Sequence, residues 1–191
     1  MGILALALAA ILPAWAGPKY RAEGLRFEAR RAMDRQAATG QGDHAAVIPP
    51  AVADLRRAVQ LDPENGRAWT DLAFALAQSW HVQRGDMGPV GRESEAAARR
   101  ALELCPLLAE AWVRLGVALD MQGRLKEGEP CFQRAVELAP HSSSWWYYYA
   151  YHLQVFPSRR NEARRALETC LALDPSNPAG ESLRKQLVNR H

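Results

Sequence analysis

The sequence lacks the short motifs that mark common catalytic and phosphate-binding sites. It contains no G-x-S-x-G, H-E-x-x-H or G-x-x-x-x-G-K-[ST] pattern. The three glycines between residues 85 and 91 are followed by Arg92 and Glu93 rather than by Lys and Ser or Thr, so they predict turns and not a phosphate cradle. We therefore expect a protein that is not an enzyme, with no catalytic residue and no cofactor.

Potential metal ligands are few and scattered. No two histidines are four residues apart, and none stands at zinc-ligand spacing from a cysteine. We expect each histidine to lie on the surface or in a loop: His44, His81, His141, His152 and His191. The cysteines form an odd set without a C-x-x-C pair, and we expect them to fill small spaces in the structure: Cys105, Cys131 and Cys170.

Excess charge and strand-forming patterns are also missing. Lys and Arg number 24 and Asp and Glu number 21, so the net charge of +3 is too small to predict a nucleic-acid partner. No alternation of Val, Ile or Thr indicates a strand, whereas the abundance of Ala, Leu and Arg favours helix. The 191 residues are enough for one domain. Together these features predict an all-α domain.

Residues 109–142 contain two apolar stripes, each at helical spacing. The first stripe has the spacing i, i+3, i+4, i+7: Trp112, Leu115, Gly116 and Leu119. The second stripe consists of Gly128, Phe132, Ala135 and Ala139. Gly123 predicts a turn between two helices, and Pro140 ends the second one. Because Gly116 and Gly128 carry no Cβ, we expect the two helices to approach each other closely there.

This 34-residue stretch resembles the tetratricopeptide (TPR) pattern W-x2-L-G-x2-Y…A-x3-F…P. Leu119 replaces the Tyr of the pattern, and Gly128 replaces its small Ala. The resemblance implies a right-handed α-solenoid of helix-turn-helix repeats. Such repeats stack because two helices alone leave one apolar face in water.

The same signature returns less regularly elsewhere. Residues 18–65 predict an irregular first repeat, with a long first helix, a loop over 39–44 and a second helix opened by Pro49 and Pro50. Residues 66–108 predict a second repeat, and residues 143–177 predict a fourth repeat with one extra residue near Pro157. Residues 178–191 predict a capping helix, whose apolar positions are Ala179, Leu183 and Leu187.

The second repeat is longer than the third. Trp69 and Pro106 are 37 positions apart, whereas Trp112 and Pro140 are 28 apart, so nine residues are inserted within 79–91. The glycines and Pro89 predict an exposed and mobile loop there. In the alternative interpretation, Trp80 or Met87 packs into the core. We name as candidate binding residues of this loop Trp80, His81, Arg84 and Asp86.

The first 17 residues are dominated by an apolar run over 2–16, GILALALAAILPAWA. Its length and the triplet Ala14, Trp15, Ala16 fit a secretory signal, but no Lys or Arg precedes it. The end of a membrane span is a second interpretation, with Trp15 at the interface and positive charge following. Either predicts a membrane-anchored or exported (periplasmic-type) protein. If residues 1–17 instead form a buried helix of the solenoid, the protein is cytoplasmic.

The resemblance implies that the first helix of each repeat lines a concave groove. The groove positions that it implies are Arg67, Thr70, Phe74, Val113, Val117, Asp120, Tyr147, Tyr151 and Gln154. They predict an apolar and aromatic groove with few charges. Within residues 145–151, WWYYYAY, we expect Trp146 and Tyr149 in the core. Tyr147 and Tyr151 lie four residues apart, and we expect them to be partly exposed in the groove.

Three functions fit this sequence. The first is a membrane-tethered or exported scaffold that binds a protein or peptide partner in the groove. The second is the soluble tail of a multispan membrane enzyme that polymerises or ligates surface glycans, similar to an O-antigen ligase, because a chain that begins within a span would explain the short apolar run. The third is a glycan-binding module, because Trp and Tyr rings also suit sugar faces.

Overall fold

The computed structural model describes residues 17–39, 43–82 and 86–188, which form nine α-helices and two short 3-10 helices without a strand. The all-α class is therefore confirmed for this part of the chain. The apolar run over 2–16 and Arg84 lie outside the described residues. None of the described helices combines the length and the apolar character needed to cross a bilayer.

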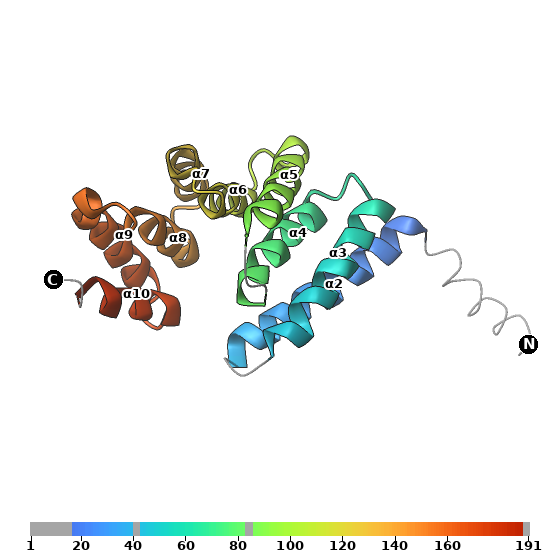
Figure 1. Cartoon of the computed structure of the whole chain (residues 1–191), viewed down its shortest axis with the longest axis horizontal. Helices are drawn as coiled ribbons and strands as arrows, with labels where there is room; N and C mark the ends of the chain where they lie inside the picture. Colours follow the sequence, from blue (N-terminus) through green and yellow to red (C-terminus); the bar gives the residue numbers. More distant parts are fainter. Residues whose placement is uncertain (1–16, 40–42, 83–85, 189–191) are drawn as a thin grey trace, which may run out of the picture.

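The helices pack as four successive pairs and a final helix (Figure 1). The pairs are α2 (Pro18–Thr39) with α3 (His44–Leu61), α4 (Gly66–Gln78) with α5 (Gly88–Leu104), α6 (Ala109–Met121) with α7 (Leu125–Leu138), and α8 (Ser143–Leu153) with α9 (Arg160–Leu173). The last helix is α10 (Pro178–Val188), and the 3-10 helices are η1 (Ser79–His81) and η2 (Pro157–Arg159). The turn η2 forms where the extra residue of the fourth repeat was predicted.

The pairs follow an arc, which is visible in Figure 1. The first helices of neighbouring pairs contact one another, α2 with α4, α4 with α6 and α6 with α8. Among the described residues, the second helices α3, α5, α7 and α9 make no contacts of comparable extent with each other. The stack therefore curves with α2, α4, α6 and α8 on its inner side, and we call the surface they form the concave face.

The close approach of α6 and α7 at two glycines is confirmed. A Cβ atom added to Gly116 would lie 2.7 Å from Cζ of Phe132, and one added to Gly128 would lie 2.6 Å from Oδ1 of Asp120. Phe132 is only 1% exposed. The missing side chain of Gly116 thus leaves the space that the Phe132 ring fills, and that of Gly128 leaves space for the Asp120 carboxylate.

The end of the stack is covered as expected. Leu183 and Leu187 of α10 are 2% and 5% exposed and join one core with α8 and α9. Cys170 is fully buried in the same core, and the prediction that it fills a small space is confirmed. The polar remainder of α10 faces water, which is how a terminal repeat of a solenoid stays soluble.

The predicted start of α3 is wrong. The helix begins at His44, where the carboxylate of Asp43 accepts a hydrogen bond from the backbone N–H of Ala45 at 2.8 Å. Pro49 and Pro50 therefore lie inside the helix, and both are exposed. On the exposed side of a helix, water can donate hydrogen bonds to the carbonyl groups that have no N–H partner. This helix therefore accommodates two prolines.

The predicted exposed loop over 79–91 is wrong in its second half. Helix α5 already begins at Gly88, and Met87 is only 7% exposed. Gly91 is buried, and a Cβ there would lie 2.9 Å from Cγ of Gln122. The alternative interpretation holds for Met87, because its apolar side chain packs where the sequence pattern suggested only turns. Trp80, in contrast, is 66% exposed.

Candidate functional site

The concave face does not contain all nine predicted groove residues at its surface. Val113 is fully buried and packs with Phe132 in the core of the third pair. Thr70 is 2% exposed, and its hydroxyl donates a hydrogen bond to the carbonyl of Gly66 at 2.8 Å. Both side chains therefore have almost no surface exposed to a ligand. Arg67 is exposed, and Phe74 and Val117 are half-buried.

Asp120 has a structural partner instead of a free surface. Its Oδ2 lies 2.8 Å from Nδ1 of His152, which is 1% exposed, so the prediction that every histidine lies at the surface is wrong. The rings of Phe132 and Phe156 pack against the imidazole, with centroids 4.9 and 5.4 Å away. Burial raises the pKa of Asp120, and the bond to His152 opposes this shift. The contact joins α6 to α8 and gives the half-buried Asp120 carboxylate a structural partner.

The tyrosine pair of α8 is partly exposed, as expected. Tyr151 is 50% exposed and Tyr147 is half-buried, and their ring centroids are 6.0 Å apart. Burial raises the pKa of Tyr147 to about 12. Gln154 is half-buried and Val155 is 51% exposed at the end of the same helix. Here the concave face offers apolar rings with polar tips.

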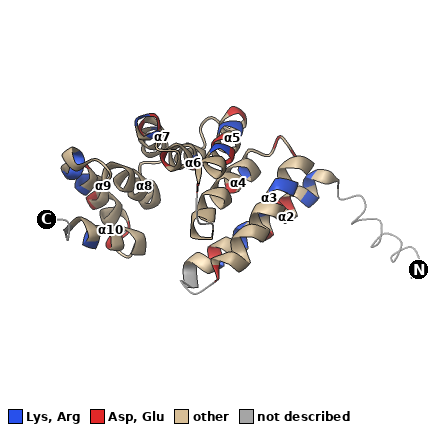
Figure 2. Cartoon of the chain, in the orientation of Figure 1, with Lys and Arg blue, Asp and Glu red and all other residues tan. Residues whose placement is uncertain are grey.

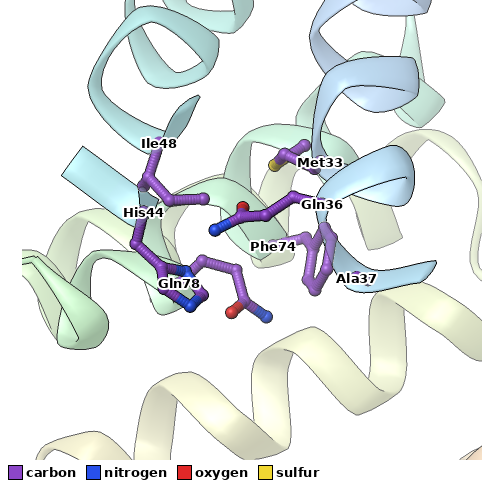
Figure 3. Close-up of a pocket in the computed structure, with 7 residues that line it drawn as sticks. All are labelled: Met33, Gln36, Ala37, His44, Ile48, Phe74 and Gln78. Atoms are coloured by element: carbon purple, nitrogen blue, oxygen red, sulfur yellow. The ribbon is translucent and has the colours of Figure 1, made fainter. Parts of the chain in front are cut away.

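A second feature lies where α2 and α4 of the concave face meet α3, and it is a hollow of about 260 Å³ between these three helices. Figure 3 shows its lining, which consists of Met33, Gln36, Ala37, His44, Ile48, Phe74 and Gln78. In that view the amide groups of Gln36 and Gln78 lie between His44 and Phe74. Nδ1 of His44 is buried and has no hydrogen-bond partner among the described residues. The hollow thus combines an apolar wall with amide and imidazole groups.

Among the predicted loop residues that the structure describes, His81 contacts this region. Its ring stacks on that of His44, with centroids 4.5 Å apart. Burial and the neighbouring His44 lower the pKa of His81. Asp86 is exposed, and its carboxylate accepts a hydrogen bond from the backbone N–H of Gly88 at 2.8 Å. Asp86 therefore helps to begin α5.

Between the hollow and the tyrosine pair lies a set of ion pairs that we call the arginine–carboxylate network. It consists of Arg26, Arg30, Asp71, Glu110 and Arg114. Asp71 of α4 binds Arg26 and Arg30 of α2 at 2.9 and 2.8 Å. Glu110 of α6 binds Arg30 at 3.1 Å and Arg114 at 2.7 Å. The network links the first helices of three repeats.

Arg114 is 4% exposed and surrounded by aromatic rings. Its guanidinium carbon lies 4.1 Å from the centroid of Phe74, 5.5 Å from that of Tyr148 and 5.9 Å from that of Trp145. Stacking on aromatic faces stabilises a guanidinium group that is buried and no longer hydrated. The predicted scarcity of charges in the groove is therefore wrong, although each carboxylate of the network lies between two guanidinium groups.

The network was missed because its partners are far apart in the sequence. Arg30 and Asp71 are 41 residues apart, and no local spacing indicates such a pair. Arg114 did carry a signal, since it stands between the buried Ala111 and Leu115 on α6. A charged residue on a buried stripe needs a partner, so its position alone predicts an ion pair or a stacking contact.

The concave face presents polar and aromatic side chains. In the part of the chain that the structure describes, no group of three or more His, Cys, Asp or Glu side chains could hold a metal ion. Burial raises the pKa of the Cys131 thiol to about 11, which keeps it protonated and a weak nucleophile. Cys105, Cys131 and Cys170 are all free thiols. Amides, paired charges and tyrosine rings suit the recognition of a polypeptide.

Comparison with known proteins assigns one repeat to a family and most of the chain to a fold. Residues 109–142 match the family model for the tetratricopeptide repeat. A search of curated proteins finds no match. Among solved structures, the chain is similar to TTC0263, a thermophilic TPR protein in Thermus thermophilus, at 15% identity and a TM-score of 0.72. The similar region covers 87% of this chain and 81% of TTC0263.

Two further solved structures share the fold. MamA is similar at 17% identity and a TM-score of 0.58, over 87% of this chain and 84% of MamA. An O-GlcNAc transferase mutant of Thermobaculum terrenum is similar at 17% identity and a TM-score of 0.63, over 81% of this chain but only 26% of the transferase. At these identities the likenesses show the fold alone, and they confirm the predicted solenoid of TPR helix pairs.

Proposed function

We propose that this chain, a tetratricopeptide-repeat (TPR) protein, is a non-catalytic scaffold whose concave face binds an extended peptide of a partner protein. The observation that carries the proposal is the hollow at Phe74 of α4 together with the partly exposed Tyr147 and Tyr151 of α8, because both helices belong to the concave face. A helical-repeat scaffold of this kind binds through such a face, because successive first helices present side chains along one continuous surface.

The hollow suits one side chain of the peptide. Its volume of about 260 Å³ and the apolar walls of Met33, Ile48 and Phe74 fit a Leu- or Phe-sized group. Gln78, at the same hollow, carries an amide with both a donor and an acceptor, which matches the peptide backbone. We assign the hollow as the first anchor point of the ligand.

The tyrosine pair supplies the second anchor point. Tyr combines a broad apolar ring with a hydroxyl and loses little side-chain entropy on binding, which makes it frequent in binding surfaces. The arginine–carboxylate network lies between the two anchor points and is held by its own ion pairs. A ligand that crosses it meets a pre-organised surface, so little conformational entropy is lost there.

We further propose that the protein is membrane-tethered or exported. The support is the apolar run over 2–16, which has the length and composition of a targeting segment. The similarity to the transferase covers 26% of that chain and gives no support for a catalytic role here.

A pair of array experiments tests the peptide proposal against the glycan alternative. The full chain, fluorescently labelled, is applied to an array of random peptides and to a glycan array. We expect saturable binding to a subset of peptides that Gln78→Ala and Tyr151→Ala each weaken. Binding to glycans alone, or peptide binding that neither substitution changes, would contradict the proposal. Phe27→Ala is the matched control, because Phe27 is 55% exposed, close to the 50% of Tyr151, but lies on the opposite side of α2 from its buried stripe.

A further inference from the structure

The whole excess of positive charge in this chain belongs to one helix. Helix α2 carries six basic side chains and three acidic ones, an excess of three that equals the +3 of the complete chain. The remaining 18 basic and 18 acidic residues balance each other. Figure 2 shows Lys and Arg at several places along α2. Among the described helices, α2 therefore has the largest positive excess, which favours an anionic partner.

The outward side of α2 also exposes large aromatic rings. Tyr20 is 74% exposed and Phe27 is 55% exposed. Together with Arg31 they stand at i, i+7 and i+11 and so share one stripe of the helix. This stripe is opposite the buried one, which contains Ala22, Ala29 and Met33. We call the stripe with its flanking arginines, Arg21 and Arg35, the outer face of α2.

Arginines surround Phe27 in a shallow hollow of about 390 Å³. Its lining is Arg26, Phe27, Arg30, Arg31, Asp34 and Arg35, with four cations against one carboxylate. Arg26 and Arg30 are already bound to Asp71 on the concave side. Arg31 and Arg21 form no ion pair with any described residue, and both are exposed. These two arginines leave positive charge on the outer face without a partner in the described part of the protein.

We propose that the outer face of α2 lies against an anionic lipid bilayer. Aromatic rings with adjacent arginines match the boundary between headgroups and acyl chains, where rings insert and guanidinium groups meet phosphates. The apolar run over 2–16 ends directly before α2 in the sequence. A membrane into which this run inserts is therefore also close to Tyr20. At the other end of the solenoid α10 covers the last repeat, whereas no described helix covers the outer face of α2.

A lipid surface explains the observations better than an acidic protein would. The exposed rings lie in the first half of one helix, the exposed Arg21 and Arg31 lie beside them, and the hollow at Phe27 is too shallow to hold a single side chain. A flat array of anionic headgroups matches such a stripe. The inference is independent of the concave face, because Tyr20 and Phe27 stand on the side of α2 opposite its packed stripe.

Vesicle binding of the full chain tests this inference. The partition coefficient is measured on neutral phosphatidylcholine vesicles and on vesicles with about 30 mol% phosphatidylserine. The double variant Arg21→Gln/Arg31→Gln should lose about 10- to 30-fold in binding to the anionic vesicles, because each cation near such a surface contributes about fivefold. Its binding to neutral vesicles should stay unchanged. The variant Tyr20→Ser/Phe27→Ser should bind both kinds of vesicle more weakly.

The matched control removes the same charge at the other end of the protein. Arg164 and Arg165 of α9 are exposed, and Arg164→Gln/Arg165→Gln should keep the wild-type partition coefficient. An equal loss in this control would overturn the inference, because net charge alone would then explain binding. The inference would also be overturned if the wild-type protein did not bind the anionic vesicles. It would fail too if an outer-face variant bound them as the wild type does. Circular dichroism verifies that all variants are folded.

Discussion

The indole Nε1 of Trp112 donates a hydrogen bond to the carbonyl oxygen of Pro106 at 2.9 Å. The same bond recurs from Trp69 to Pro63 at 2.9 Å and from Trp146 to Pro140 at 2.8 Å. Each indole thus ties the first turn of one helix pair to the end of the preceding pair. The repeated tryptophan therefore serves two purposes, since its ring packs against the core and its N–H fixes the spacing between repeats.

Replacing Trp112 separates these two contributions. Trp112→Phe keeps a ring and loses the hydrogen bond, so it should lower the free energy of unfolding by about 1 kcal/mol. Trp112→Ala also loses the packing and should cost about 3 kcal/mol. Urea denaturation measures both. The exposed Trp80 provides the control. If Trp112→Phe lowers the free energy of unfolding no more than Trp80→Phe does, the bond to Pro106 contributes nothing to stability.

Two glycines should respond in opposite directions to the same substitution. Gly116→Ala places a Cβ 2.7 Å from Phe132 Cζ in a packed core and should destabilise by about 1–3 kcal/mol. A Cβ at Gly24, in the middle of α2, meets nothing within 4 Å, so Gly24→Ala should stabilise by about 0.5–1 kcal/mol. Thermal and urea unfolding give the two values. Equal effects at both positions would contradict the close packing of α6 on α7.

Arg114 should be among the least tolerant charged residues of the chain. Arg114→Met removes a buried cation from Glu110 and from the Phe74 ring, which should cost about 3 kcal/mol or more because Glu110 keeps only Arg30. Arg134 forms an exposed pair with Glu137, and Arg134→Met should change stability by less than about 1 kcal/mol. Similar costs at the two positions would mean that the network on the concave face is solvated.

The network should also make stability depend on pH. Burial favours a raised pKa for Glu110, but Arg114 and Arg30 outweigh it and hold the pKa below its usual value of 4.5. A carboxyl group with a lowered pKa in the folded state stabilises the fold above its unfolded-state pKa, and this contribution is lost as the pH falls through the folded-state value. The free energy of unfolding should therefore decline below about pH 4.5, and less so in Glu110→Gln. Identical pH profiles for the two proteins would refute the assignment.

The sequence predicted the elements whose apolar residues recur at helical spacing. The stripes of α6 and α7 and the apolar position of Leu183 in α10 follow from that spacing, and the close approach at Gly116 and Gly128 follows from their missing Cβ atoms. The start of α3 was missed because the rule for proline in a first turn competed with an Asp43 cap that is equally visible in the sequence. Here the side-chain cap determined the start of the helix, and the prolines did not.

The candidate site was less predictable than the fold. Tyr147 and Tyr151 were found because a helix places residues four apart on one side. The hollow at Phe74 was not found, since it also needs Gln36 of α2 and His44 of α3, whose relative position only the packed structure gives. The burial of His152 depends on Asp120, 32 residues earlier in the chain, and no local pattern indicates that contact.

The affinity for a peptide selected on the array, measured by isothermal titration calorimetry, tests the central claim most directly. Tyr147→Ala/Tyr151→Ala should retain the helical circular dichroism spectrum and weaken binding by about 1–3 kcal/mol, or roughly 5- to 150-fold in Kd. Tyr151→Ala alone, at the more exposed ring, should show part of this loss with an unchanged melting temperature. Wild-type affinity in both variants, or unfolding of both, would contradict the assignment of the concave face as the peptide-binding site.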